Sequence, residues 1–528
     1  SYGGDTNGDM NASQPRAGNW GYIKFTSQGG IKNTFGYCVL KYGGTGSSLS
    51  SYQPMLWITS QNTAFSDVTI DHCELSKASS VGVRVDGVAK PTISNNNFTD
   101  CPYPLLQDGM GFPNYVNNTK SGSGYSAIGI QGTMNPSVSE TRTLSLVKDW
   151  VYVVTNDISI GSNMTVAVDA GVIIKLQSVE HIEVSGIFDV QGTAANPVIF
   201  TSIKDDSYGG DTNGDMNASQ PRAGDWGYIK FTTKAGLANT FDYCVLKYGG
   251  YYSSSSYPDI PLNAMLWITS TNASFADVKV DHCELSKALY IGIRVDGVAK
   301  PMITYSSITK TGGDGVFITG TSNSVSGINY CDFTSCSGLA INNTNNNSII
   351  DAKYNWWGNI SGPSHSSNPT GQGEKVSNKV DFNPWLSAPI YESNLVNKLK
   401  GKVLRKNGSI ISYAKVEIIQ NDVVIETIQT GSDGVFSALV SLGTYNIRAS
   451  KDGFVAMMFI NAKVNFESAD PPSIDFKLQE IVTNTRPNIL LLTNYRRFSN
   501  LYKGTDSDHN HLKDRKSTRL NSSHRIRS

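Results

Sequence analysis

The sequence predicts an all-β chain, in which a long parallel β-solenoid is followed by a small antiparallel β-sandwich. The first observation is a tandem repeat, because SYGGDTNGDMNASQPRAGNWGYIKF at Ser1–Phe25 returns almost unchanged at Ser207–Phe231. The second is composition, since 50 Gly and 17% charged residues favour short strands and tight turns over helices. The third is a shorter period inside each repeat. Repeats at these two scales are typical of stacked architectures.

The shorter period is about 23 residues, which is one coil of a solenoid. Ile70 in VTIDHC recurs as Ile93 in PTISNN, and the second repeat has the series Val280, Ile303 and Ile328. The strands VGVRV at 81–85 and IGIRV at 291–295 alternate, so Val and Ile face one side and Arg the other. A unit this short cannot bury its apolar face alone, whereas stacked coils share a continuous core.

Six of the seven cysteines follow Tyr, His or Asp in strands such as FGYCVL, as small apolar side chains in an interior ladder would: Cys38, Cys73, Cys101, Cys244, Cys283 and Cys331. Reactive thiols are the alternative. The odd number and the lack of CxxC spacing argue against a disulfide framework or a zinc site. Asn95–Asn97 and Asn342–Asn347 suit left-handed turns at the coil corners.

Two landmarks then suggest a known fold. AVDAGVIIKL and VQGTAANPVIFTS, within 149–206, resemble the opening coils of right-handed parallel β-helix proteins from bacterial surfaces, which share the pectate-lyase-like fold. YNWWGNISGPSHSSNPTGQGEKVSNKVDFNPWL at 354–386 resembles their closing segment. The resemblance implies a first repeat segment at 1–149, truncated at its N-terminus, and a second at 150–390. It also implies that Trp356, Trp357 and Trp385 cover the open end, which would otherwise expose unpaired strand edges.

Residues 398–480 have a different sequence pattern. Alternating strands are separated by Asn-Gly, Ser-Asp-Gly and Lys-Asp-Gly turns, which indicates a small antiparallel β-sandwich. The segment resembles the carboxypeptidase regulatory-like domain at Gly401, Ala414, Asp433-Gly434, Gly443-Thr444-Tyr445 and Gly453. That resemblance implies an accessory module without catalytic residues.

The end of the chain is of two kinds. Residues 481–513 include PNILLLTN and YRRFSNLYKG, which we interpret as a linker or the start of a truncated further domain. Residues 514–528 contain DRKSTRLNSSH, which resembles one reading frame of a short-read sequencing adapter and indicates read-through at the end of an assembled DNA fragment. We therefore leave this tail out of the fold prediction. A basic nucleic-acid-binding arm is the alternative.

Charge and hydropathy limit the partners. The formal net charge is zero, which gives no indication of nucleic-acid binding. No apolar run approaches the roughly 18 residues that a membrane-spanning helix needs. The resemblance to surface β-helix proteins implies an extracellular or cell-surface location, and we expect a monomer.

The Asp/Asn-rich loop of each repeat is a candidate calcium site. The candidate ligands are Asp5, Asn7, Asp9 and Asn11 in the first repeat and Asp211, Asn213, Asp215 and Asn217 in the second. Oxygen ligands at alternate positions suit Ca²⁺, and the pattern resembles the start of an EF-hand loop. Met10 and Met216 stand where the EF-hand has Gly, and the closing Glu is missing, so the affinity would be lower unless Asp205 or Asp206 contributes in the second repeat. A solvated turn stabilised by Asp and Asn side chains is the alternative.

A catalytic site is the second possibility. IDHCE at 70–74 and VDHCE at 280–284 are similar to a strand of pectate lyases, in which carboxylates bind Ca²⁺ and an Arg removes a proton. The resulting candidates are Asp71, His72 and Arg84 in the first repeat and Asp281, His282 and Arg294 in the second. No paired carboxylates set for glycoside hydrolysis are evident. If these side chains face one groove, they favour an enzyme, whereas different faces favour a scaffold.

Aromatic residues offer a third surface. Trp57, Trp267, Tyr251, Tyr252 and Tyr257 lie near Ser-rich insertions, where exposed rings would stack on sugars, although buried packing of the two Trp is the alternative. Together these features predict a non-catalytic scaffold or adhesin-like protein that contacts polysaccharides or cell-surface glycans and is stabilised by calcium. A calcium-dependent polysaccharide lyase or a glycoside hydrolase of the same fold is the alternative.

Overall fold

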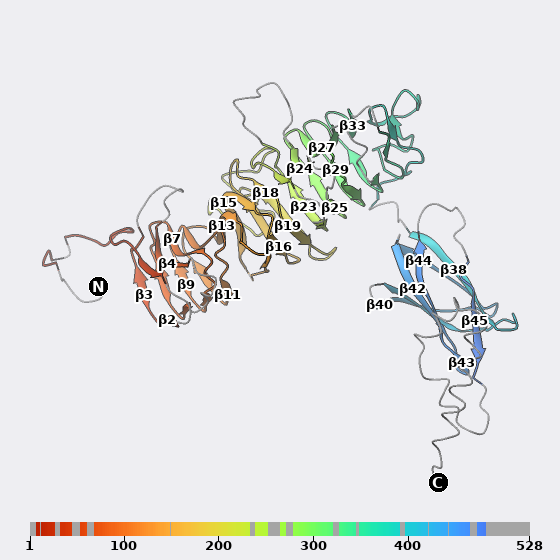
Figure 1. The fold of residues 1–528 in the computed structure, drawn as a ribbon, viewed down its shortest axis with the longest axis horizontal. Coiled ribbons are helices and arrows are strands. Elements are labelled where there is room, and N and C mark those ends of the chain that lie inside the picture. The colour runs from red at the N-terminus through yellow and green to blue at the C-terminus, as the bar shows by residue number, and fades with distance from the viewer. Residues whose placement is uncertain are drawn as a thin grey trace, which may run out of the picture. The chain divides into compact units, whose positions relative to one another are not determined.

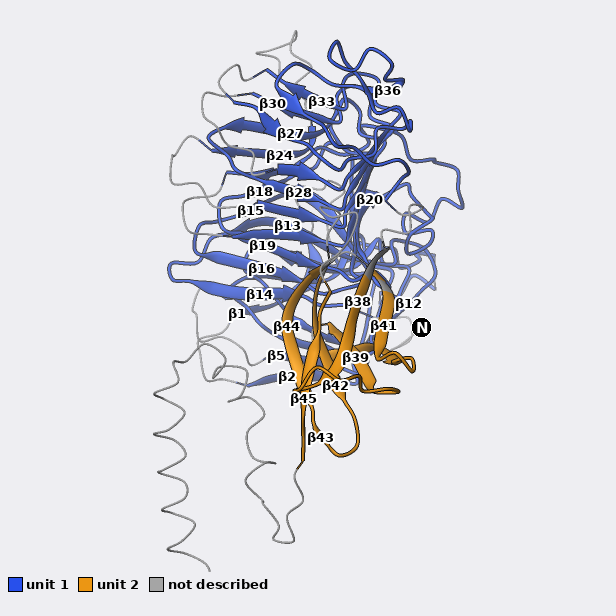
Figure 2. Ribbon diagram, turned by 90° about the vertical axis from the view of Figure 1, so that its right-hand side faces the viewer, with its two compact units in different colours: residues 1–390 blue, residues 391–528 orange. Residues whose placement is uncertain are grey.

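The computed structural model shows two compact units, residues 1–390 and 391–528 (Figure 2). It describes residues 7–10, 12–26, 32–44, 53–60, 68–147, 149–232, 238–251, 264–270, 278–319, 327–344, 348–390, 396–420, 422–441, 443–464 and 473–481. All regular elements in these ranges are β-strands. The predicted segments at 481–513, apart from Ile481, and 514–528 lie outside the described residues.

The first unit is a stack of coils with up to three short strands each (Figure 1). Strands β4, β5 and β6 form one coil, for example, and each pairs in parallel with β7, β8 or β9 of the next. The strands up to residue 144 are β1 (Ile23–Thr26), β2 (Asn33–Gly36), β3 (Val39–Lys41), β4 (Pro54–Ser60), β5 (Val68–Asp71), β6 (Glu74–Ser76), β7 (Val81–Gly87), β8 (Thr92–Ser94), β9 (Asn97–Thr99), β10 (Tyr103–Asp108), β11 (Asn114–Val116), β12 (Thr119–Ser121), β13 (Ala127–Met134) and β14 (Glu140–Leu144).

The stack continues through the second repeat without a break, because β13 pairs with β15 and β14 with β16. Its strands are β15 (Val151–Ile160), β16 (Met164–Val168), β17 (Ile173–Leu176), β18 (Ile182–Val184), β19 (Ile187–Gln191), β20 (Val198–Ser202), β21 (Ile229–Phe231), β22 (Asn239–Asp242), β23 (Cys244–Lys247), β24 (Ala264–Ser270), β25 (Val278–Asp281), β26 (Glu284–Ser286), β27 (Ile291–Gly297), β28 (Met302–Thr304), β29 (Ser307–Thr309), β30 (Val316–Ile318), β31 (Gly327–Asn329), β32 (Asp332–Thr334), β33 (Ile341–Asn343), β34 (Ile350–Asp351), β35 (Pro363–Ser364), β36 (Gly373–Lys375) and β37 (Val380–Asp381).

Strand pairing confirms the period inferred from the sequence. Ile70 is paired with Ile93, and the series Val280, Ile303 and Ile328 is paired coil by coil. The strands form one 18-stranded sheet, a 7-stranded sheet, two 4-stranded sheets and two 2-stranded sheets, all parallel. Because neighbouring parallel strands lie about 4.8 Å apart, equivalent residues of successive coils form ladders along the stack.

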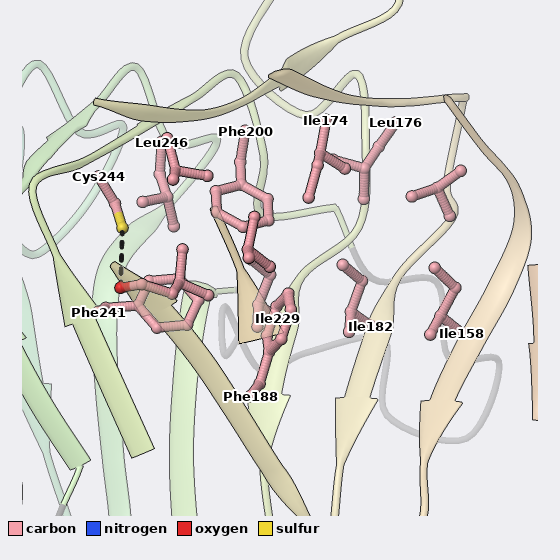
Figure 3. Close-up of a cluster of buried hydrophobic side chains, with 14 of the residues drawn as sticks. Ile158, Ile174, Leu176, Ile182, Phe188, Phe200, Ile229, Phe241, Cys244 and Leu246 are labelled. Atoms are coloured by element: carbon pink, nitrogen blue, oxygen red, sulfur yellow. Dashed lines mark hydrogen bonds between the residues drawn. The ribbon is translucent and has the colours of Figure 1, made fainter. Parts of the chain in front are cut away.

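The core is a continuous column of these ladders. Phe188, Phe200 and Phe241 come from three different strands of two successive coils, and their ring centroids lie 5.6–6.0 Å apart. Figure 3 shows these side chains in the core. All seven cysteines are free, and five of them are buried. The Sγ atoms mostly donate to interior carbonyls, as Cys244 does to Val190 O. Buried thiols in this setting act as small apolar side chains, which agrees with the predicted ladder.

The asparagines are only partly as predicted. Asn95 occupies a coil corner with a left-handed φ of 56°, but Asn96 is buried and donates to the Ile70 carbonyl at 3.0 Å. Asn97 lies in β9, and Asn342 and Asn343 in β33. The reason is that an interior Asn side chain satisfies backbone groups that a sharp corner leaves unpaired. Many of the corners are instead formed by Tyr, His, Lys and Asp with positive φ.

Aromatic residues lie over the last coils. Trp357 is fully buried, and its ring stacks on Phe333 of β32 with centroids 5.2 Å apart. Trp356 bridges to Asp332, and Trp385 packs against the core beside Phe382. These contacts shield the apolar end of the column from water.

The second unit is a sandwich of two four-stranded sheets. One has the order β41-β38-β45-β43 and the other β40-β39-β42-β44. All pairings are antiparallel except that of β38 with β45. Its strands are β38 (Val396–Arg405), β39 (Lys415–Gln420), β40 (Val423–Gln429), β41 (Val435–Ser441), β42 (Gly443–Ser450), β43 (Phe454–Val455), β44 (Met457–Val464) and β45 (Phe476–Glu480). The predicted fold class, a parallel β-solenoid followed by an antiparallel β-sandwich, is therefore confirmed.

Candidate functional site

The Asp-His pair of the first repeat is engaged in internal contacts. Asp71 ends β5, and His72 follows at a corner with φ of 51°. Asp71 Oδ2 lies 2.6 Å from His72 Nδ1, while Oδ1 accepts hydrogen bonds from Ser94 Oγ and Asn95 Nδ2 at 2.6 and 2.9 Å. The hydrogen bonds from Ser94 and His72 lower the pKa of Asp71 to about 2. The His72 ring stacks on Tyr37.

The pair of the second repeat belongs to a larger ion cluster. His282 Nδ1 lies 3.4 Å from Asp281 Oδ2 and 3.7 Å from Asp242 Oδ1, and Lys279 Nζ is 2.6 Å from Asp281 Oδ2. Burial opposes charge on His282, but the two carboxylates outweigh it and raise the pKa of His282 to about 9. A metal ligand must be a neutral imidazole. Without a metal the three residues and Lys279 form a network of ion pairs, while Asp242, Asp281 and His282 also lie close enough together to hold a metal ion once His282 is deprotonated.

The two candidate Arg residues lie on a different sheet from the Asp-His pairs. Arg84 in β7 and Arg294 in β27 belong to the 18-stranded sheet, whereas β5 and β25 belong to the 4-stranded and 7-stranded sheets. Arg84 Nη2 donates to Asp108 at 2.7 Å and Nε lies 3.3 Å from Asp86. Arg294 Nε donates to Asp296 at 2.8 Å. The structure thus separates residues that the lyase hypothesis needs in one groove.

The candidate Trp residues are packed between cations. In the ladder of β1, β4 and β7, Trp57 is paired with Lys24 on one side and Arg84 on the other. Lys24 Nζ lies 3.8 Å and Arg84 Cζ 5.3 Å from the ring centroid. The same arrangement surrounds Trp267 with Lys230 and Arg294, at 4.3 and 4.7 Å. Because a cation covers each ring from both neighbouring strands, these Trp faces are not open to a sugar.

The remaining aromatic candidates form no described platform. Tyr251 is 36% exposed, while Tyr252 and Tyr257 lie outside the described residues. Sequence reasoning missed a longer aromatic ladder at one corner of the second repeat, with centroids 4.5–5.2 Å apart: Tyr243, His282, Tyr305, Tyr330 and Tyr354. These rings stack on one another, so they present edges to solvent. The signal was visible in the sequence, because Tyr or His precedes Cys at five places in the chain.

The Asp/Asn loop of the second repeat is closed by its own hydrogen bonds. Asp215 accepts from Ser219 N at 3.1 Å and Asn213 Nδ2 at 2.9 Å, and the hydrogen bond from the Ser219 hydroxyl lowers the pKa of Asp215. The Asp211 carboxylate accepts from three backbone N–H groups, those of Gly214, Asp215 and Met216. Asn217 is exposed with φ of 66°. These contacts are also expected of a turn without a ligand.

One residue outside the loop is not explained by such a turn. Asp206 brings its carboxylate to Asp211 and Asp215, so that one oxygen from each lies within 4.8 Å of the others. Both Asp206 oxygens are buried, and neither has a hydrogen-bond partner among the described residues. The same holds for Asn213 Oδ1. Burial and the neighbouring Asp211 raise the pKa of Asp206.

The other charges near this cluster do not neutralise it. Lys175 Nζ donates to Gly210 O at 2.9 Å, and burial lowers the pKa of Lys175 to about 8. Asp205 is not available, because its two oxygens accept from Thr201 Oγ1 and Ser207 Oγ. The sequence did not decide whether Asp205 or Asp206 lies beside the loop carboxylates. In the structure it is Asp206 whose carboxylate lies close to those of Asp211 and Asp215. One lysine beside several carboxylates leaves an excess of negative charge, which suits a divalent cation.

The first-repeat loop is seen only in part, because Asp5 and Asn11 lie outside the described residues. Asn7 Nδ2 donates to Asp9 Oδ2 at 3.0 Å, and Ser13 N donates to the same oxygen at 2.9 Å. The equivalent bonds in the second repeat join Asn213, Asp215 and Ser219. The two copies therefore share the described part of the loop structure.

Comparison with known families identifies the second unit. A model of the carboxypeptidase regulatory-like domain matches residues 398–479. This range agrees with the predicted segment, and the observed sandwich occupies the same residues. No curated protein matches the chain. Among the described residues there is no helix that is long and apolar enough to cross a membrane.

Proposed function

We propose that this protein is a non-catalytic, secreted or surface-displayed scaffold whose solenoid contacts glycans. The observation that carries the proposal is the separation of Asp71 and His72 from Arg84, and of Asp281 and His282 from Arg294, on different sheets. A lyase base must reach the same substrate carbon that a neighbouring carboxylate or metal activates. Residues on different sheets of a solenoid face different directions.

The state of the arginines supports the same conclusion. An Arg that acts as a base has to lose a proton, yet Arg84 and Arg294 donate to carboxylates and lie over Trp rings. These contacts hold each guanidinium against side chains of its own sheet. Their repetition in both copies is what a structural ladder of Lys, Trp and Arg requires. The extracellular location rests on the resemblance to surface β-helix proteins.

We further propose that the second-repeat loop binds Ca²⁺ through Asp206, Asn213 and neighbouring carboxylates. The support is the buried carboxylate of Asp206, whose oxygens lack partners, beside Asp211 and Asp215. A carboxylate buried without a hydrogen bond is costly, and a hard cation removes that cost by accepting oxygen ligands. The role of Ca²⁺ here is to hold the loop against the coil, so the expected gain is in stability.

Calcium binding is tested by thermal unfolding and titration calorimetry of the full chain with CaCl₂ and with a chelator. We expect binding heat and a higher unfolding temperature with Ca²⁺. Saturation at about 100 times the Kd corresponds to roughly 2.7 kcal/mol of stabilisation. Asp206→Asn should remove most of the effect, while Asp205→Asn serves as the neighbouring control for folding. Absence of both a heat and a shift in the wild-type protein would refute the site.

The non-catalytic function is tested by incubating the full chain with acidic and neutral polysaccharides, with Ca²⁺ and with chelator. We expect no new reducing ends and no ultraviolet absorbance from unsaturated products. Calcium-dependent turnover that is lost in the Arg84→Ala, Arg294→Ala double variant would overturn the proposal and make the protein a lyase. Circular dichroism of the variant separates lost chemistry from lost folding.

A further inference from the structure

A groove of about 590 Å³ crosses neighbouring coils of the second repeat at the corner where β23, β26, β29 and β32 end. Its charged lining residues are Arg222, Lys287 and Lys310, and its other lining residues carry no carboxylate. Most other described bases of this repeat are paired, as Lys247 is with Glu284. Among the described residues, no carboxylate forms an ion pair with these three cations.

Strand register explains why two of these cations lie together. Ser286 of β26 is paired with Thr309 of β29, so the next residues, Lys287 and Lys310, occupy the same corner of successive coils. Both have left-handed φ values, 59° and 54°. Their backbones are thus about 4.8 Å apart along the stack, as neighbouring strands are. Like charges at this spacing destabilise a sheet unless a counter-charge is present.

The first repeat shows the compensated version of the same corner. Lys77 follows Ser76, which is paired with Thr99, so its neighbour in the next coil is Asp100. The charge of Lys77 is one cause of the lowered pKa of Asp100, after the hydrogen bonds from Ser123. The second repeat keeps the lysine but has Lys310 where the first has Asp100. The first repeat thus has a pair of opposite charges, Lys77 and Asp100, at this corner, whereas the second repeat has two positive charges, Lys287 and Lys310.

Other lining groups suit a sugar chain. Lys287 Nζ donates to Tyr248 Oη at 2.8 Å, which orders the lysine beside an aromatic ring. Ser335 and Ser337 add exposed hydroxyl groups, and Leu289 adds apolar surface. Glu374 is not a lining residue, but it accepts a hydrogen bond from the lining residue Ser335. Because Thr309 is paired with Thr334, Ser335 is the residue of the next coil that follows Lys310 at this corner. The groove is open, which fits an extended chain more than an enclosed small molecule.

We infer that this groove binds an anionic glycan, with carboxylate or sulfate groups on Lys287, Lys310 and Arg222. The inference rests on the proposed glycan-contacting function and specifies its ligand class and its face. Nucleic acid is less suitable, because its affinity depends on neutralising many phosphates and the groove offers three cations. Hydroxyl and apolar lining groups, in contrast, match sugar hydroxyls and C–H faces.

The test is binding of the full chain to immobilised oligogalacturonate, dextran sulfate, neutral dextran and single-stranded DNA at low and at physiological salt. We expect binding to one or both anionic glycans that weakens with salt. Lys310→Asp, which installs the residue of the first repeat, should weaken it about tenfold, because an attraction becomes a repulsion. Lys300→Asp changes charge equally, but at a corner outside the groove lining, and should have little effect.

Each outcome bears on the inference. Preference for oligogalacturonate or for dextran sulfate identifies the carboxylate or the sulfate as the recognised group, and both support it. Binding that Lys310→Asp leaves unchanged, equal binding of neutral dextran, or binding of DNA alone would overturn it. The glycan is sized after incubation, so a shortened chain would refute the non-catalytic function separately from the binding site.

Discussion

Asp242 controls the charge of His282, and this can be tested because the chain contains its own comparison. The register places Asp242 opposite Asp281, while Gly36 occupies the equivalent place opposite Asp71 in the first repeat. Two carboxylates opposite each other would repel, and a protonated His282 between them removes the repulsion. We therefore expect Asp242→Asn to lower the pKa of His282 from about 9.

The size of the change follows from the structure. A rise from 6.5 to about 9 corresponds to roughly 3 kcal/mol of preference for the charged form. The His282 side chain is 34% exposed, so solvent screening reduces this to about 1–2 kcal/mol. With Asp281 still present, we expect Asp242→Asn to lower the pKa of His282 by about one unit.

The sign of the stability effect is also defined. Because the folded pKa of His282 lies above its unfolded value, this group stabilises the protein fully below about pH 6.5. The contribution is lost as the pH rises toward 9, and Asp242→Asn should make the loss smaller and move it to lower pH. The assay is an NMR titration of the imidazole signals, with His72 as the unaffected reference. An unchanged His282 pKa in Asp242→Asn would refute the reasoning.

Three further predictions concern the stability of the solenoid. Phe241→Ala should lower the free energy of unfolding by about 3–5 kcal/mol in urea denaturation, because the ring is fully buried between coils, and a loss under 1 kcal/mol would contradict this. Gly297→Ala should lower the free energy of unfolding by more than about 1 kcal/mol, because φ is 65° and a Cβ would lie 2.0 Å from Ser270 O. An unchanged midpoint of urea denaturation would contradict this and show that the corner relaxes. Burial and Asp157 raise the pKa of Glu180 to about 7, so ionisation costs stability as the pH rises from about 4.5 through 7. Glu180→Gln should therefore raise the unfolding temperature at pH 8 but not at pH 4, and equal shifts at both would exclude this cause.

Much of the architecture could be predicted because a solenoid encodes its packing locally. The interval from Ile70 to Ile93 is set by a single coil, and alternation alone places Arg84 away from the core. The role of Asn96 could not be predicted in this way, because its side chain is needed by carbonyls and amides of neighbouring coils. The conformation of a corner depends on the side chains of the neighbouring coils, and the period of the sequence does not identify those side chains.

The candidate sites show the same division. The candidate ligands Asp211 and Asp215 could be predicted from local spacing. Asp206 could be preferred over Asp205 only from the structure, because Thr201 and Ser207 donate hydrogen bonds to Asp205. The cationic groove required the pairing register, because Lys310 is unremarkable until Lys287 is known to stand beside it. Sequence indicates which residues recur, and the register determines which of them meet.

The Lys-Trp-Arg ladder keeps the same register in both repeats although the coils differ in length. Ile23 is paired with Leu56 in the first repeat and Ile229 with Leu266 in the second, although the intervening chain is four residues longer in the second. Since the added residues do not shift a single partner downstream, a foreign peptide inserted there should leave the stack in register. The pairing of β24 with its neighbours therefore does not depend on the number of residues between β23 and β24.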